Sequence, residues 1–211
     1  MIIFQRQVTF EGPMEEVAPW ALEITEAVNK STHLNVSLWQ GVFGGPLGTL
    51  GWSARVDNLT ALEAATDSLA GDASYSSLVA KARDWTSTPG EDSLLRVMHT
   101  AGGDYVRPGV GGYAEGTTAI PAEGKLAKAG AFGVEIADLH SRLTHSSVLF
   151  CTSEYGAFGE MRWLALYDSA AAVDAAAEAI AKDEAYGEKL DDAGALFVEG
   201  LARRTLARRI A

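Results

Sequence analysis

The alternation of apolar and polar residues divides the first half of the chain into short strands and longer helices. Ile2–Phe10 is rich in β-branched and aromatic residues, which is typical of a strand. Apolar residues then recur at helical spacing from Val17 to Val28, directly after Pro13, which suits the start of a helix. The same reasoning predicts strands at Leu34–Val42, Thr49–Val56 and Ser93–Thr100, and two helices that begin after Asp57 or Asn58, break at Gly71-Asp72 and end near Trp85.

The second half repeats this order of elements. Residues 48–79 align without a gap on residues 159–190, 111 positions further along, and the aligned pairs include Trp52/Trp163, Asp57/Asp168, Asp72/Asp183 and Tyr75/Tyr186. The elements predicted in this half are strands at Tyr113–Ile120, Ser147–Thr152, Met161–Tyr167 and Ala202–Ile210, and helices at Glu123–Leu143 and Ala170–Asp192. We place the first unit at residues 1–101, a glycine-rich linker at 102–112 and the second unit at 113–211.

Each unit therefore has the order βαββαβ, the ferredoxin-like arrangement of an antiparallel sheet with two helices on one face. The other face of such a sheet needs cover. In a duplicated chain the two sheets can cover one another, so we expect an α+β protein whose two tandem units form a pseudo-dimer.

A motif in each unit points to a family. It runs from Gly45-Pro46-Leu47 through a strand with Trp52 and Asp57 to an alanine-rich helix, and it recurs in residues 156–190, where Ala157-Phe158 replaces Pro-Leu. This motif resembles the core motif of the NIPSNAP family. The resemblance implies the dimeric α/β barrel fold, shared with antibiotic-biosynthesis-monooxygenase-like domains, in which two ferredoxin-like sheets pack into a barrel. That superfamily includes cofactor-free oxygenases, polyketide cyclases, isomerases, haem enzymes and members with no known activity.

Composition and charge narrow the class of protein. Of the 211 residues, 47% are hydrophobic and 21% are charged, which is typical of a globular chain. The net charge of −11 argues against binding to nucleic acid or to an anionic membrane. No long apolar stretch and no secretory signal is evident, and a single cysteine excludes an internal disulfide and a cysteine-based zinc site. We expect a cytoplasmic protein.

Five polar or aromatic residues are candidates for binding a small ligand. Arg96 and His99 lie on the last strand of the first unit, and simple alternation places them on opposite faces, so that one of them points into the interior. An arginine or histidine in a mostly apolar cleft can orient an acidic or phenolic ligand. The alternative is a solvated sheet edge or a salt bridge to one of the many acidic residues. The candidates are Trp39, whose repeat partner is Cys151, and Arg55, Arg96, His99 and Arg162.

Two histidines allow a second hypothesis. Haem-binding relatives of the fold attach the iron to one histidine of the second unit, which implies His140 or His145 as the ligand here. The alternative is that His145 simply ends a helix, as its repeat partner His33 would in the first unit. No histidine and carboxylate cluster has metal-ligand spacing, so the sequence predicts no metal site and no cofactor apart from this haem alternative.

These patterns lead to one functional prediction with two alternatives. We predict a protein that binds a small organic molecule, either as a binding protein alone or as a cofactor-free monooxygenase or cyclase. The alternatives are a non-catalytic protein-interaction module and a haem-binding enzyme. A homodimer is left open, and so is the role of the C-terminal arginines, which either dock an acidic partner or balance the acidic body of the chain; these are Arg203, Arg204, Arg208 and Arg209.

Overall fold

The structure is a computed structural model, and it describes residues 1–86 and 89–211. The first unit consists of β1 (Ile2–Thr9), α1 (Met14–Thr32), β2 (Ser37–Phe43), β3 (Thr49–Val56), α2 (Leu59–Ala70), α3 (Ala73–Ala82) and β4 (Glu91–Ala101). The second consists of β5 (Tyr113–Ala119), α4 (Leu126–Thr144), β6 (Ser147–Tyr155), β7 (Met161–Tyr167), α5 (Ala170–Lys182), α6 (Glu184–Ala193) and β8 (Arg203–Arg209). The βαββαβ order predicted for each unit is confirmed.

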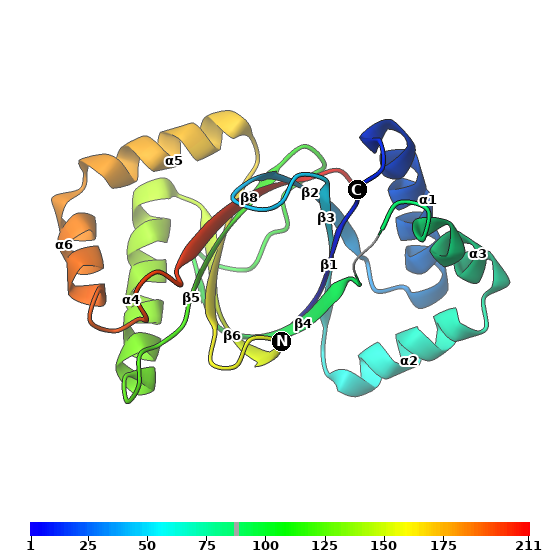
Figure 1. Cartoon of the computed structure of the whole chain (residues 1–211). Coiled ribbons are helices and arrows are strands. Elements are labelled where there is room, and N and C mark those ends of the chain that lie inside the picture. The colour runs from blue at the N-terminus through cyan, green and yellow to red at the C-terminus, as the bar shows by residue number, and fades with distance from the viewer. Residues whose placement is uncertain (87–88) are drawn as a thin grey trace.

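Eight antiparallel strands close into one barrel. The first unit contributes the order β4-β1-β3-β2 and the second the order β8-β5-β7-β6. Their edges join through β2 with β8 and through β4 with β6, so neither sheet keeps a free edge. The helices of the two units lie on opposite outer flanks of the barrel (Figure 1). The prediction of two ferredoxin-like units packed as a pseudo-dimeric α/β barrel is therefore confirmed.

Each strand has one face toward the barrel interior and one toward the helices. In the first unit, the apolar stripe of α1 with Val17, Trp20 and Ile24 packs on the helix-facing residues of β2 and β3, such as Leu38 and Trp52. The interior contains a separate and smaller apolar cluster, which is formed by Ile3, Leu95, Leu149 and Cys151. The space outside the barrel, between sheet and helices, is thus distinct from the space inside it.

Two helices differ from their predicted bounds. The helix predicted at Ala170–Asp192 is two helices, because Asp183 ends α5 and caps α6 by accepting a hydrogen bond from the Tyr186 amide. Asp72 makes the corresponding break in the first unit. Helix α4 begins at Leu126 and not at Glu123, because Gly124 adopts a left-handed conformation at φ 69°.

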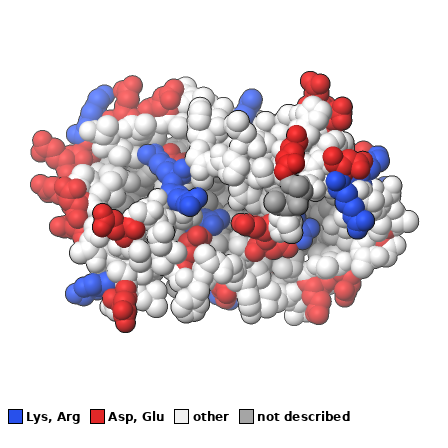
Figure 2. All heavy atoms as spheres, in the orientation of Figure 1, with Lys and Arg blue, Asp and Glu red and all other residues white. Residues whose placement is uncertain are grey.

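The arginine-rich C-terminal segment forms strand β8, as the sequence predicted, between β2 and β5. On the face shown in Figure 2, acidic side chains are spread over both units, and Lys and Arg side chains gather in a group left of the middle and in another at the right. No helix in the described part of the chain is long and apolar enough to cross a membrane.

Candidate functional site

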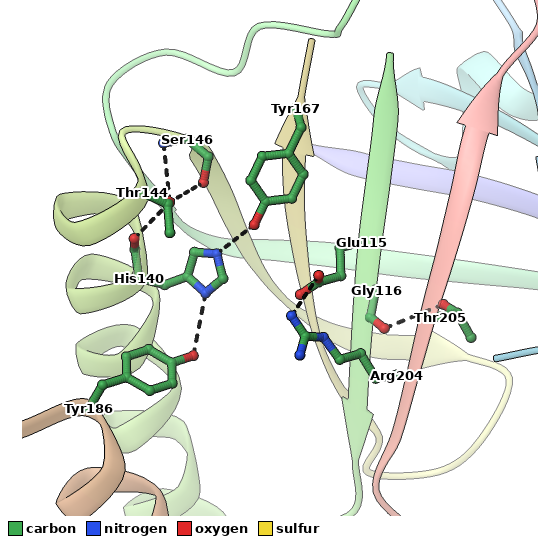
Figure 3. Close-up of polar contacts among 9 residues, drawn as sticks. All are labelled: Glu115, Gly116, His140, Thr144, Ser146, Tyr167, Tyr186, Arg204 and Thr205. Carbon is green, nitrogen blue, oxygen red and sulfur yellow. Dashed lines mark hydrogen bonds and ion pairs between the residues drawn. The ribbon is translucent and has the colours of Figure 1, made fainter. Parts of the chain in front are cut away.

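A group of polar side chains lies between the sheet and the helices of the second unit (Figure 3). Its members come from β5, α4, β7, α6 and β8, and we refer to them as the polar cluster: Glu115, His140, Tyr167, Tyr186 and Arg204. The surrounding layer holds apolar side chains, so burying this group costs free energy unless each of its polar atoms has a hydrogen-bond partner.

His140 is the centre of the polar cluster and is only 8% exposed. Its Nε2 atom lies 2.9 Å from the Tyr167 hydroxyl, and its Nδ1 atom lies 3.4 Å from the Tyr186 hydroxyl. A neutral imidazole has one N–H and one lone pair. One tyrosine therefore accepts a hydrogen bond from the ring, and the other donates one to it.

Burial sets the protonation states of these three side chains. It lowers the pKa of His140, with nearby Arg204 acting in the same direction and Glu115 opposing it. Burial also raises the pKa of Tyr167 and of Tyr186. At neutral pH the site therefore holds a neutral imidazole between two protonated phenols, a combination that can accept a proton and donate hydrogen bonds at the same time.

Glu115 and Arg204 form the side of the polar cluster nearest to solvent. The buried Glu115 carboxylate accepts a hydrogen bond of 2.7 Å from Nη2 of Arg204, whose side chain is 58% exposed. Figure 3 shows the guanidinium between Glu115 and the Tyr186 ring. A molecule arriving from solvent would therefore meet a guanidinium first and the histidine behind it.

Small residues bring α4 close enough to the sheet to form the polar cluster. The buried stripe of α4 contains Ala129, Gly133 and Ala137 ahead of His140. A Cβ atom on Gly133 would lie 2.4 Å from the ring of Phe150, so only glycine permits this approach. His140, next along the stripe, then reaches the end of β7 and its last residue, Tyr167.

Sequence reasoning considered His140 only as a haem ligand and missed the rest of the polar cluster. Its members are far apart in the sequence, and only the fold brings them together. One signal was nevertheless present, because three of them have an apolar residue at the equivalent position of the first unit: Val28 for His140, Val56 for Tyr167 and Phe4 for Glu115.

Three of the five predicted ligand-binding residues point into the barrel. The indole N–H of Trp39 donates to the Ser53 hydroxyl at 2.9 Å, and the Arg55 guanidinium lies 4.9 Å from the centre of the Tyr105 ring. Arg162 forms hydrogen bonds with Gln5 and Glu160. Trp39 and Arg55 belong to one group of side chains at a mouth of the barrel, which is described below, and Arg162 is not part of it.

Arg96 and His99 both lie on the outer face, so the expectation that they face opposite ways is wrong. A register shift in β4 pairs Val97 with Cys151 but His99 with Phe150, and this irregularity changes the face on which the following residues lie. Arg96 forms an ion pair with Glu154, and His99 lies 2.7 Å from Asp138 on α4. The structure does not bring either residue to the other candidates.

The surroundings of the two histidines do not fit a haem. Both ring nitrogens of His140 face tyrosine hydroxyls, and apolar helix and sheet residues pack the same layer. His145 ends α4 in a left-handed conformation, as His33 ends α1, which confirms the structural alternative for this pair. The depression beside His145 does not suit a haem, because it lacks large apolar side chains to pack on the macrocycle; the residues described as lining it are Gly102, Asp138, Ser141, Arg142 and His145.

No other metal site is evident within residues 1–86 and 89–211, where no three His, Cys, Asp or Glu side chains gather in a way that could hold an ion.

Neither a family model nor a curated protein matches this sequence. Solved structures match it in fold. A candidate monooxygenase from Fusobacterium nucleatum is 10% identical with a TM-score of 0.72, over 100% of this chain and 92% of that chain. An anthrone oxidase-like protein is 14% identical with a TM-score of 0.67, over 100% and 91%. A haem-degrading enzyme from Listeria monocytogenes is 11% identical with a TM-score of 0.52, over 99% of both chains.

These likenesses, at such low identity, concern the fold alone. They show that the chain has the fold of dimeric α/β barrels, with both halves of the barrel in one polypeptide. Activity has to be argued from the side chains.

Proposed function

We propose that this protein is a cofactor-independent oxygenase of small phenolic or enolisable molecules, with its reaction at the polar cluster. The observation that carries the proposal is the neutral, buried His140 between two tyrosine hydroxyls. The fold is shared with candidate monooxygenases and with an anthrone oxidase-like protein, which supports the same class of reaction.

The proposed reaction uses dioxygen as the oxidant and needs only a base and hydrogen-bond donors. His140 takes a proton from the activated CH₂ group of a ketone of the anthrone type through the hydroxyl of the tyrosine that donates to its ring, while the other tyrosine hydroxyl donates to the enolate oxygen that forms. The carbanion transfers its electrons to O₂ and a C–O bond forms. The histidine returns its proton to the peroxide, which loses water and leaves a carbonyl. The sum is CH₂ plus O₂ giving C=O plus H₂O.

Anthrone in air, with metal-stripped protein, is the first test. We expect oxygen uptake above the spontaneous rate, with one ¹⁸O atom from ¹⁸O₂ in the product. His140→Gln should reduce the rate by about 100-fold or more, the usual contribution of a positioned base. His145→Gln is the matched control, because this histidine lies on the same helix but outside the polar cluster. Oxidation at the background rate, or an unaffected His140→Gln variant, would overturn the proposal.

We infer a second candidate function, a protein-interaction module, from two turns. Leu47 is 92% exposed and Phe158 is 99% exposed, and they occupy equivalent positions in the β2–β3 and β6–β7 turns. These turns carry part of the NIPSNAP-like motif, which supports membership of that family. The exposed apolar side chains in the same turns support a role in protein interaction. The simplest partner is a second copy of this chain.

Sedimentation velocity over a range of protein concentrations tests this second function. Concentration-dependent association that Leu47→Ser and Phe158→Ser abolish together would support it. A chain that stays monomeric throughout, or association that survives both substitutions, would count against it.

A further inference from the structure

The mouth of the barrel crossed by the linker carries a second group of polar side chains, separate from the polar cluster. Figure 1 shows the chain between β4 and β5 running across the barrel opening. Tyr105, on this segment, packs against the interior apolar cluster, and Arg55 of β3 lies over its ring. Arg107, two residues further along, reaches the buried Ser37 hydroxyl at 2.8 Å. The segment thus supplies side chains to the interior.

Three arginines meet at this mouth, and within residues 1–86 and 89–211 no carboxylate side chain is among their contacts. Arg107 also donates to the main-chain oxygen of Asn35 at 2.7 Å. Arg209 of β8 donates to the main-chain oxygens of Pro108 at 2.6 Å and Ala211 at 2.8 Å. Arg55 contacts the Tyr105 ring. Even if the oxygen of Ala211 belongs to a terminal carboxylate, three guanidinium groups face one negative charge.

This arrangement contrasts with other arginines of the barrel strands. Four of them form an ion pair with an acidic side chain, and the pairs are Arg6–Asp92, Arg96–Glu154, Arg162–Glu160 and Arg204–Glu115. Carboxylates are plentiful in a chain with a net charge of −11. Their absence from the contacts of Arg55, Arg107 and Arg209 therefore leaves a local excess of positive charge in an acidic protein.

The excess charge is confined to one side of the pseudo-dimer. The strand registers place Leu166 of the second unit at the position equivalent to Arg55, and Val97 of the first unit at the position equivalent to Arg209. A structural requirement of the barrel would apply to both halves alike. The like charges also affect one another, since burial first and Arg107 second lower the pKa of Arg209.

We propose that this mouth is an oxyanion-binding site, formed by Arg55, Arg107 and Arg209, for the carboxylate or phosphate group of a small molecule. Guanidinium groups present planar pairs of N–H donors that match the oxygens of both anions. An anion there neutralises charges that the protein leaves uncompensated. Trp39, which pairs with Arg209 across the β2–β8 junction, forms part of the wall beside the site. The site is independent of the proposed oxygenase reaction, since its residues belong to the barrel interior and the linker.

Isothermal titration calorimetry of the full chain at low ionic strength tests the site, with inorganic phosphate and succinate as the two probes. We expect saturable binding of at least one probe, and the tighter one identifies the ligand as a phosphate or a carboxylate. Arg55→Gln and Arg209→Gln should each weaken binding by roughly tenfold or more, because each removes a charge-assisted hydrogen bond. Arg55 is exposed, so its variant is expected to keep the fold, and circular dichroism checks this.

Arg96→Gln is the matched control, because Arg96 is an arginine of another barrel strand, β4, that faces outward and already has an acidic partner. It should bind the probe like the wild type. Failure of both probes to bind saturably would overturn the proposal. So would equal losses in the Arg55→Gln and Arg96→Gln variants, which would indicate a general electrostatic effect.

Discussion

The space between sheet and helices is filled by apolar side chains in the first unit, and by apolar side chains together with the polar cluster in the second. In the first unit, aromatic rings meet edge to face with centroids 5.3 to 6.4 Å apart; the pairs are Phe10–Trp20, Phe10–Trp52, Trp20–Trp52 and Trp20–Trp85. In the second unit, His140 and Tyr167 occupy the positions of Val28 and Val56. A duplicated fold can therefore keep one copy for stability while the other copy acquires chemical groups.

The second unit has not lost its aromatic core altogether. Trp163, the repeat partner of Trp52, stacks on Phe150 and donates a hydrogen bond to the main-chain oxygen of Gly133. The polar cluster occupies the part of the layer beyond it, around the last turns of α4. The difference between the units is thus local, and single substitutions can test it.

The largest loss of stability is expected from a substitution in the aromatic core of the first unit. Trp52→Ala removes a buried indole that contacts Phe10 and Trp20 and donates to the Thr25 hydroxyl, and it should lower the free energy of unfolding by about 3–5 kcal/mol. Trp163→Ala should cost less, because Trp163 is only half-buried. Urea denaturation measures both variants, and a larger loss for Trp163→Ala would contradict the assignment of the first unit as the stabilising half.

The second-largest loss of stability is expected from a substitution in the polar cluster. His140→Leu leaves the Tyr167 hydroxyl without its histidine partner, and the expected cost is about 1–3 kcal/mol. The double variant with Tyr167→Phe should recover part of that loss, because it also removes the hydroxyl that has lost its histidine partner. A double-mutant cycle from urea denaturation measures the coupling. Strictly additive losses would show that the two side chains do not interact.

The repeat made much of the fold predictable, and two strands, Thr49–Val56 and Met161–Tyr167, have the bounds that the pattern indicated. The features that predict helices and strands are local in the sequence: apolar periodicity, capping residues and glycine-rich turns. The break at Asp183 was missed, although its repeat partner Asp72 had been recognised as a break. Comparison of the two units position by position would have found it.

The sites were much less predictable, for two reasons. The face of a strand residue follows from strict alternation only while the register is regular, and the shift between Val97 and His99 breaks that rule without a glycine or proline to announce it. The partner of a polar residue, in turn, depends on strand order. Glu115 meets Arg204 only because β5 and β8 are neighbours across 89 positions of sequence.

The third effect is a dependence of stability on pH. The pKa of His140 is lower in the folded protein than its ordinary value of 6.5, so the unfolded chain binds a proton more readily. Stability is therefore present above pH 6.5 and is lost as the pH falls from 6.5 toward the folded pKa. Urea midpoints between about pH 7.5 and about pH 5 should fall less steeply for His140→Gln than for the wild type. Equal slopes would mean that His140 is not held neutral by the fold.

The smallest effect on stability is expected at the two aspartates that separate consecutive helices, Asp72 and Asp183. Hydrogen bonds from the Ser74 hydroxyl, the Tyr75 amide and the Ser31 hydroxyl lower the pKa of Asp72 to about 2 from 3.8. Its stabilising contribution is thus present above pH 3.8 and is lost as the pH falls toward 2. Asp72→Asn should weaken the acid dependence of unfolding more than Asp183→Asn does, because the hydrogen bond found at Asp183 comes from one amide. The reverse order in an acid titration followed by circular dichroism would refute the comparison.

The closure of the barrel by β8 also affects how the chain reaches its fold. β8 pairs with β5 of its own unit and with β2, where Trp39 meets Arg209 across roughly 170 residues of sequence. A nascent chain synthesised only as far as residue 200 lacks this strand, and both β2 and β5 then present unpaired edges that can associate with other chains. Contacts of such sequence separation form slowly. The last strand of the barrel to be synthesised is therefore the one that ends the period in which the edges of β2 and β5 are prone to aggregation.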